Sequence, residues 1–309
     1  MEPHKISDEF MSKMPTKSPI SHVIPISGKD SLATALVQKV NNPTVPYTYV
    51  FNDVGSELPE TYEWLNLIEL KTNWKILKIG CDLQNMIKKN KVLPSRRMRY
   101  CTTKAKILPF EKFFAGKSIT VYYGLRADEP DRKGYVPHNN IKPVYPLREM
   151  GITLPMVLSI CKSQGLKPPT FFWQRLYARV SEEMASRCPL FDWRDCLSEI
   201  EFDLLFAGRS RSNCYFCFFQ RLYEWVWLSE VHPDLFENAL KMEQDCGSSN
   251  YTWRQDYSLT EVRDRADATI AKRTKQVCNY IEKRMSSKLF GGIEVDDLSL
   301  TSCGLLCGK

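Results

Sequence analysis

Short hydrophobic runs alternate with helical periodicities along the first half of the chain. Four β-rich runs predict strands over residues 22–26, 47–51, 74–79 and 118–123. Between them, apolar residues at helical spacing predict helices over 30–40, 59–70 and 104–114. Strands that alternate with helices are typical of a parallel sheet that is covered on both faces. The pattern therefore predicts an α/β domain over residues 21–150, preceded by a flexible polar arm at 1–20.

The second half of the chain has mainly helical periods. They predict helices over residues 155–162, 173–185, 197–206, 215–231 and 233–243. Ser258-Leu-Thr-Glu261 is a capping box, which predicts the start of a long helix that ends near Met285. We therefore expect a mainly helical region over residues 151–309, which carries a cysteine pair and ends in a cysteine-containing tail.

Composition excludes several classes of protein. Of the 309 residues, 43% are hydrophobic and 26% are charged, which is enough for a core and excludes a wholly disordered chain. No run approaches the roughly 18 apolar residues that a membrane helix needs, and the N-terminus lacks an apolar signal core. We therefore expect a cytoplasmic protein with no membrane partner. In that compartment most of the 11 cysteines remain thiols, and the net charge of +7 is compatible with anionic ligands.

A candidate anion-binding loop, Ile26-Ser-Gly-Lys-Asp-Ser31, follows the first predicted strand. Glycine lets the backbone approach an anion closely, and a helix N-terminus directs N–H groups and partial positive charge at it. Lys29 adds a full charge, and the Ser31 hydroxyl can donate a hydrogen bond. The alternative is an ordinary helix start in which Asp30 and Ser31 are capping groups. The loop is not the P-loop of kinases, which needs a different glycine spacing.

The segment Ser-Gly-Lys-Asp-Ser at 27–31 resembles the pyrophosphatase-type loop, Ser-Gly-Gly-Lys-Asp-Ser, of the adenine nucleotide α-hydrolase superfamily. Three later segments are similar, in order, to motifs of phosphoadenosine phosphosulfate (PAPS) reductases: FNDVGSELPETY at 51–62, RYCTTKAKILP at 99–109 and GLRADEPDR at 124–132. On these four motifs the chain is identified as a member of the PAPS reductase-like, PP-loop family. The resemblance implies a Rossmann-like parallel-sheet domain. One departure is that Ile26 stands where the family has its first serine, or that the loop is one residue shorter than in the family; Ser27 is the adjacent hydroxyl.

The resemblance also implies an activity and a site. ATP or a related adenine nucleotide, with Mg²⁺, would bind beyond the carboxyl ends of the strands. Lys29 and Asp30 are the implied catalytic residues. The implied nucleotide-binding residues are Ser27, Gly28, Lys29, Asp30, Ser31, Asp53, Gly55, Arg99, Gly124, Arg126, Glu129 and Arg132. The enzyme would adenylate its substrate, release pyrophosphate and transfer sulfur. The alternatives are a sulfonucleotide reductase with Cys303 as nucleophile, and a non-catalytic module that senses nucleotides or binds nucleic acid.

Cysteines form a second candidate site. A CxxC pair such as Cys214-Tyr-Phe-Cys217 suits zinc, an iron–sulfur cluster or thiol exchange, whereas two helix-buried thiols that pack as small hydrophobes are the alternative. The resemblance implies a 4Fe–4S cluster that is held by Cys101, Cys214 and Cys217, with Cys303 or Cys307 as fourth ligand or redox thiol. We assign no function to Cys81, Cys161, Cys188, Cys196, Cys246 and Cys278.

A basic run covers residues 88–106, which contain eight Lys and Arg residues and no acidic residue. Such a run is usually a solvated face, but it also attracts polyanions and makes nucleic acid a candidate partner. Arg209, Arg211 and Arg221 add charge near the CxxC pair. The aromatic residues at 171–173 and 223–227 can stack on bases, although their spacing favours core packing. The sequence identifies no sulfur donor.

Overall fold

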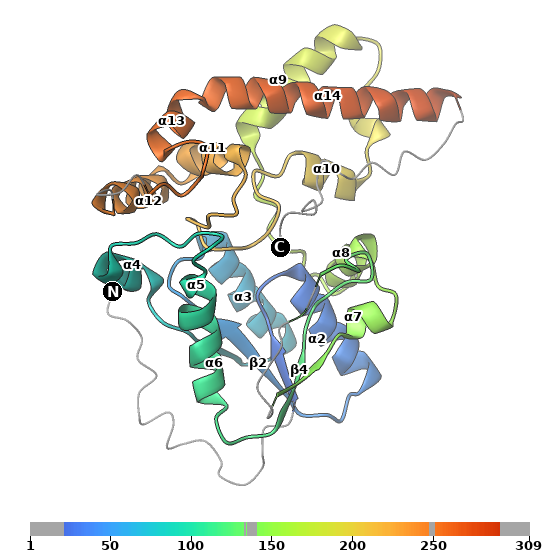
Figure 1. Ribbon diagram of the computed structural model, residues 1–309. Helices are drawn as coiled ribbons and strands as arrows, with labels where there is room; N and C mark the ends of the chain where they lie inside the picture. Colours follow the sequence, from blue (N-terminus) through green and yellow to red (C-terminus); the bar gives the residue numbers. More distant parts are fainter. Residues whose placement is uncertain (1–21, 133, 135–140, 247–250, 291–309) are drawn as a thin grey trace. The chain divides into compact units, whose positions relative to one another are not determined.

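The computed structural model of the protein describes residues 22–132, 134, 141–246 and 251–290 (Figure 1). Its backbone contacts divide the chain into two compact units. The first unit comprises Met1–Asn90 and Arg97–Pro168, and the second comprises Lys91–Arg96 and Pro169–Lys309.

A parallel sheet forms the centre of the first unit. Its five strands are β1 (His22–Pro25), β2 (Tyr47–Asn52), β3 (Ile76–Ile79), β4 (Ile119–Tyr122) and β5 (Ile141–Val144). Every neighbouring pair is parallel, and the order across the sheet is β3-β2-β1-β4-β5. The chain builds the sheet outward from β1 in one direction and then reverses to add β4 on the other side. This order confirms the predicted Rossmann-like parallel-sheet domain.

Helices cover both faces of the sheet. Successive side chains of a strand point to opposite faces, so each apolar strand contributes residues to both. Ile24 and Ile26 pack in one cluster with residues of α2 (Lys29–Asn41), α3 (Pro59–Thr72) and α8 (Leu154–Ser163). Val23 and Val50 pack in the other cluster with Phe110 of α6 (Leu108–Phe113) and with Phe114. The two faces therefore have separate hydrophobic cores, as a doubly wound fold requires.

Helix α8 belongs to the first unit, whose boundary lies at Pro168 rather than near residue 150. It packs against α2, and Val157, Cys161 and Leu166 are members of the same core cluster. The indole Nε1 of Trp64 also donates to the carbonyl oxygen of Leu166 over 3.3 Å. Burial of these apolar residues against α2 and α3 explains why the unit continues beyond the sheet.

Several elements of the first unit differ from the sequence prediction. The chain also forms α4 (Leu83–Asn90), α7 (Pro146–Glu149) and strand β5, none of which the periodicity predicted. β5 contains Pro143, which lacks an N–H and is tolerated because β5 is an edge strand of the sheet. The helix predicted over 104–114 begins earlier, as α5 (Tyr100–Thr102), and passes through a π-helical turn, Thr103–Ile107, into α6.

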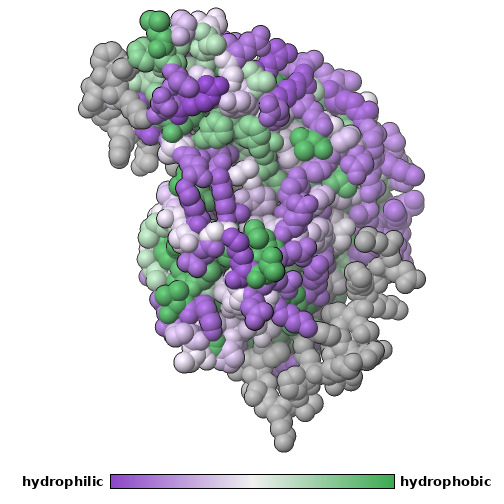
Figure 2. Space-filling model, turned by 180° about the vertical axis from the view of Figure 1, so that it is seen from behind, coloured by the Kyte–Doolittle hydropathy of each residue, from purple (hydrophilic) through white to green (hydrophobic). Residues whose placement is uncertain are grey.

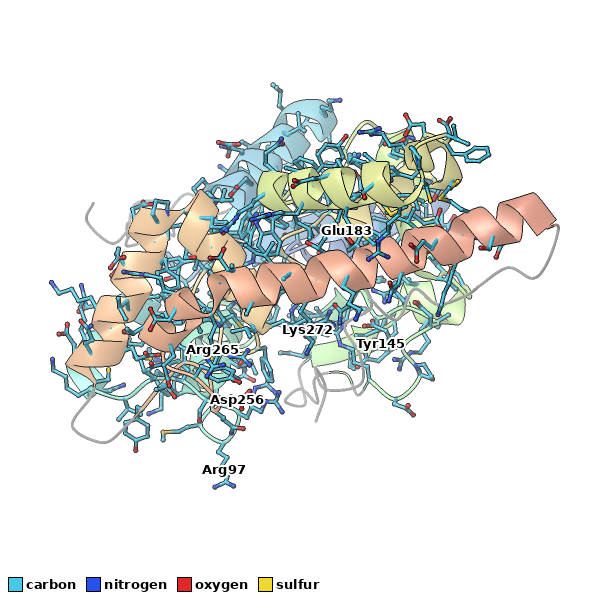
Figure 3. The ribbon with its side chains drawn as sticks, turned by 90° about the horizontal axis from the view of Figure 1, so that it is seen from above. Arg97, Tyr145, Glu183, Asp256, Arg265 and Lys272 are labelled. Carbon is cyan, nitrogen blue, oxygen red and sulfur yellow. The ribbon has the colours of Figure 1, made fainter. Side chains whose placement is uncertain are left out.

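The second unit is helical in the residues that the structure describes, as predicted. Its helices are α9 (Gln174–Arg187), α10 (Glu199–Leu205), α11 (Leu222–Val231), α12 (Pro233–Asp245), α13 (Leu259–Asp264) and α14 (Ala266–Phe290), with a 3-10 turn at Trp193–Cys196. α14 packs against α9 and α11. Arg187 joins α9 to α14 because its guanidinium binds Glu183 at 2.8 Å and Glu282 at 2.9 Å, and Figure 3 shows Glu183 between the two helices.

Two helix predictions for this unit were wrong in extent. The long helix does begin at the predicted capping box, where Ser258 Oγ accepts from Glu261 N–H and the Glu261 carboxylate accepts from Ser258 N–H. However, it breaks at Arg265 into α13 and α14. The helix predicted over 215–231 exists only from Leu222 onward. The CxxC pair therefore lies outside helical structure.

The surface agrees with the ordinary composition. On the face shown in Figure 2, hydrophilic residues predominate and hydrophobic residues form separate patches among them. Among the described residues, no helix has both the length and the apolar character needed to cross a membrane.

Candidate functional site

The loop between β1 and α2 begins with a core residue. Ile26 is fully buried, and its N–H donates to the carbonyl oxygen of Val50 over 2.7 Å, which continues the pairing of β1 with β2. Ser27 is exposed. Ile26 is therefore part of the sheet core, and the exposed hydroxyl at the start of the loop is that of Ser27.

Ser31 caps this loop internally. Its Oγ accepts hydrogen bonds from the N–H groups of Ser27 (2.8 Å) and Gly28 (3.0 Å) and donates to the Gly28 carbonyl oxygen (2.8 Å). The helix-capping role weighed for Ser31 is thus present. The N–H groups of Lys29 and Asp30, in the first turn of α2, have no acceptor within the helix and lie at its positive end. An anion at this loop would meet these two groups and the Lys29 side chain.

The segment after β4 lies directly against the start of α2. A Cβ atom on Gly124 would be 2.6 Å from the Asp30 carbonyl carbon and 2.7 Å from Ser31 N, so only glycine fits this approach. Two residues further on, Arg126 Nη1 donates to Asp30 Oδ1 over 3.0 Å. The loops that follow β1 and β4 therefore meet at the point where the strand order reverses, which is where doubly wound folds bind ligands.

Arg126 is held by several carboxylates. Besides Asp30, it binds Asp128 through Nε at 2.9 Å and lies 3.7 Å from Glu129. Burial lowers the pKa of Arg126, but the Asp30 carboxylate and its neighbours outweigh that effect and raise the pKa overall. The guanidinium therefore stays charged and fixes the Asp30 carboxylate beside the loop.

Arg148, on α7, fixes the rest of this segment. One of its Nη atoms donates to the carbonyl oxygens of Glu129 (2.7 Å) and Arg132 (3.0 Å), while Arg132 pairs with the Glu129 carboxylate at 3.2 Å. The sequence reasoning did not single out Arg148, because a lone arginine in a four-residue helix has no distinguishing local pattern. Its contacts nevertheless determine where Glu129 and Arg132 lie.

The loop after β2 contributes Asp53. Its Oδ1 accepts from Gly55 N–H and from the Tyr62 hydroxyl, both at 2.8 Å. Gly55 has φ +67°, a left-handed conformation that favours glycine. Burial, followed by the hydrogen bond to Asp53, raises the pKa of Tyr62, so its hydroxyl remains a donor. Tyr62 is thus a positioning group for Asp53 that the motif contained but the sequence reasoning gave no role.

The order of the strands determines which of the predicted nucleotide-binding residues lie near one another. Those of the first, second and fourth motifs follow β1, β2 and β4, which are adjacent in the sheet. Arg99 belongs to the third motif and lies at the start of α5, with its side chain exposed and its carbonyl oxygen accepting from Thr102 N–H. Arg97, two residues earlier, projects outward into solvent (Figure 3).

A family model described as the phosphoadenosine phosphosulfate reductase domain matches residues 21–196. The chain belongs to this family. The match includes all five strands and the four motifs, and it ends at the 3-10 turn before α10. No curated protein matches the chain. As a member of the PAPS reductase-like group, the protein is an enzyme of that group whose chemistry involves a nucleotide.

The CxxC pair of this PAPS reductase-like protein lies beyond the matched residues, in two consecutive turns. Cys217 N–H donates to the Cys214 carbonyl oxygen at 3.0 Å, and Gln220 N–H donates to that of Cys217 at 2.9 Å. The predicted helical setting of the pair was wrong because Tyr215 and Phe216 between them pack into the core, where Phe216 stacks on Trp253 with ring centroids 5.0 Å apart. Cys214 is buried, and Cys217 is half-buried.

The remaining predicted metal ligands are distributed along the chain. Cys101 is half-buried in α5 of the first unit, whereas Cys303 and Cys307 lie outside the described residues. Among the described residues, no three His, Cys, Asp or Glu side chains form a group that could hold a metal ion. The CxxC turn therefore offers two thiols from one unit, and further ligands would have to join them.

Other residues considered from the sequence have packing roles. Phe171, Trp173, Trp225 and Trp227 are buried, as the spacing of the aromatic segments predicted, whereas Tyr223 is half-buried and Phe172 is exposed. Cys161, to which we assigned no function, lies against the candidate anion-binding loop: its Sγ contacts the Lys29 carbonyl oxygen at 3.6 Å. Burial raises the pKa of Cys161 to about 12, so it stays a thiol there.

Proposed function

We propose that the protein is an ATP-dependent sulfurtransferase that adenylates an acceptor, releases pyrophosphate and then transfers sulfur. The observation that supports this function most strongly is the meeting of the β1 and β4 loops through Gly124 and the Arg126–Asp30 ion pair. Because of this contact, the loop at residues 27–31 lies where the strand order reverses, which is where such folds bind nucleotides.

In this proposal the chain's own groups stabilise the departing pyrophosphate. The acceptor oxygen attacks the α-phosphorus of ATP, and the bond to the bridging oxygen breaks with its electron pair leaving on pyrophosphate. The Lys29 ammonium and the first-turn N–H groups of α2 donate to the phosphate oxygens as that charge develops. The second step displaces AMP by a sulfur nucleophile, which completes the transfer.

Mg²⁺ fits the donors at this site. The carboxylates of Asp30 and Asp53 follow adjacent strands, and carboxylate oxygens are the ligands that Mg²⁺ prefers. When bound, the ion would offset charge on the phosphates. The ion pair with Arg126 and the hydrogen bond from Tyr62 hold these two carboxylates in place.

A 4Fe–4S cluster forms part of the proposal. Cys214 and Cys217 stand at the two ends of one tight turn, which suits a pair of thiolate ligands. Cys101 would be the third ligand, with Cys303 or Cys307 as the fourth. The cluster would supply an iron site for sulfide. Replacing Cys101, Cys214 or Cys217 by Ser should lower the iron and acid-labile sulfide of anaerobically purified protein, whereas Cys188→Ser should leave both unchanged.

Pyrophosphate release from ATP tests the central claim. We expect Lys29→Ala to weaken ATP binding at least tenfold, because a charge-assisted hydrogen bond contributes roughly 1.5–3 kcal/mol. Lys39→Ala is the matched control, since Lys39 lies in the last turn of the same helix and donates to the Pro43 carbonyl oxygen. Equal ATP affinity and equal turnover in both variants would contradict the assignment of the loop.

The second candidate is a sulfonucleotide reductase, which the family match itself favours. In that reaction a cysteine attacks the sulfur of a bound phosphosulfate. Thioredoxin-dependent reduction of PAPS, without pyrophosphate release from ATP, would establish this candidate instead.

A further inference from the structure

Two arginines of the second unit lie over the same aromatic ring. The guanidinium carbon of Arg96 lies 5.7 Å from the centroid of the Phe219 ring, and that of Arg211 lies 5.9 Å from the same centroid. Both distances are within the cation–π range of about 6 Å. We call Arg96, Arg211 and Phe219 the Phe219 platform. It joins the basic segment Lys91–Arg96 to the loop that carries the CxxC pair.

The two guanidiniums of the platform have no ion-pair partner among the residues that the structure describes. In the part of the chain that the structure describes, neither Arg96 nor Arg211 has a carboxylate within 4.0 Å. Other arginines of this unit do have such partners: Arg175 pairs with Glu230, and Arg194 pairs with Asp192 at 3.0 Å. Two guanidiniums that share one ring therefore retain their full capacity to bind an anion.

The platform is also accessible and supported. Arg96 is exposed, and Arg211 and Phe219 are half-buried. The neighbouring Phe218 ring lies 4.3 Å from the Phe219 ring, centroid to centroid, and so supports it. A partly exposed ring flanked by arginines can stack on a base while the guanidiniums bind the adjoining phosphates.

We propose that the Phe219 platform binds single-stranded nucleic acid. This inference rests on the proposed function, because it names the acceptor of the sulfur transfer. The chemistry that favours this ligand is the combination of a stacking surface with two unpaired guanidiniums, since bases and phosphates alternate along a single strand.

Fluorescence anisotropy with a labelled single-stranded oligonucleotide tests the inference directly, without ATP. We expect Phe219→Leu to weaken binding about tenfold or more, because stacking on one aromatic side chain has an effect of this size. We expect the double variant Arg96→Ala/Arg211→Ala to weaken binding and to reduce the slope of log affinity against log salt by about 1.4, or roughly 0.7 for each phosphate that is no longer neutralised. Phe219→Leu should leave that slope unchanged.

Arg179→Ala is the matched control, since Arg179 is an exposed arginine of α9 in the same unit. It should bind like the wild type, and circular dichroism should show the same fold for every variant. The inference is overturned if the wild type binds no single strand at low salt, or if folded platform variants bind as tightly as Arg179→Ala. It is also overturned if free AMP or ATP binds in a platform-dependent way and the oligonucleotide does not.

These results are separable from the test of the proposed function. Platform-dependent binding of the oligonucleotide without pyrophosphate release from ATP would support the nucleic-acid site and contradict the proposed sulfurtransferase. Pyrophosphate release that depends on Lys29, without binding of a single strand, would retain the enzyme and reject this acceptor.

Discussion

The carboxylate of Asp30 and the guanidinium of Arg126 form an ion pair with 3.0 Å between Oδ1 and Nη1. Asp30 lies in the first turn of α2, and Arg126 follows β4, so the pair joins segments that are far apart in the sequence. Both side chains are largely buried, with 22% and 11% of their surface exposed. The pair therefore contributes both to the fold and to the position of the proposed phosphate loop.

A double-mutant cycle should detect this coupling. We expect Asp30→Asn and Arg126→Gln each to lower the free energy of unfolding by about 1–3 kcal/mol, because each removes one charged member of a largely buried ion pair. The double variant should lose less than the sum, with a coupling energy of about 0.5–3 kcal/mol. Urea unfolding measures all three values, and strictly additive losses would show that the pair contributes no coupling.

Gly124→Ala should destabilise the first unit. The added Cβ would be 2.6 Å from the backbone of Asp30, which cannot move without displacing α2. We expect a loss of about 1–3 kcal/mol in the free energy of unfolding, the usual cost of overpacking. Gly28→Ala is the contrasting variant, because its Cβ has no neighbour within 4 Å and its φ of −178° is extended. Equal urea midpoints for the two variants would contradict the close approach at Gly124.

Thiol reactivity should follow burial. Burial raises the pKa of Cys161 to about 12 and that of Cys278 to about 11, so both are almost entirely protonated at pH 8. Because the thiolate is the reactive form, iodoacetamide should modify these two slowly in the folded protein. Cys188 and Cys196 are half-buried and should react before these two. Mass spectrometry of peptides after timed alkylation gives the order, and early modification of Cys161 would contradict its placement against the loop.

Glu243 should make stability depend on pH. Burial raises its pKa above the usual 4.5, although its carboxylate accepts from Trp253 N–H and Leu259 N–H, both at 2.8 Å. Because the pKa of Glu243 is higher in the folded than in the unfolded protein, its contribution to the free energy of unfolding is complete below about pH 4.5. This contribution decreases as the pH rises through the pKa of the folded protein. Glu243→Gln removes the titrating group.

The free energy of unfolding of Glu243→Gln, relative to the wild type, should therefore increase as the pH rises above 4.5. Glu182→Gln is the control, since Glu182 is exposed on α9. Thermal unfolding from pH 4 to pH 8 measures the difference. A constant difference across this range would show that Glu243 titrates alike in the folded and unfolded chain.

The local sequence pattern was sufficient to predict those helices and strands whose apolar residues pack into the core at regular spacing. The apolar run at residues 22–26 predicted a buried strand, and helical spacing predicted α2 and α3 close to their observed bounds. The four motifs predicted the family because each is a distinctive run of residues and the four occur in the family's order along the chain, and the family match confirms this prediction.

The remaining features depend on contacts between distant residues. Nothing near Arg148 in the sequence shows that it would bind the carbonyl oxygens of Glu129 and Arg132. Likewise, the apolar run around Phe216 suggested a helix, but stacking on Trp253 holds it in turns. Such features are decided by tertiary packing, which overrides local propensity.

The segment Lys91–Arg96 has a consequence for any attempt to dissect the protein. Because it belongs to the second unit, the chain changes unit after Asn90, after Arg96 and again after Pro168. A fragment that starts at Pro169 would lack Arg96 and its contact with the Phe219 ring. A single recombination junction could not exchange the helical unit intact between relatives, so we expect the two units to have been inherited together.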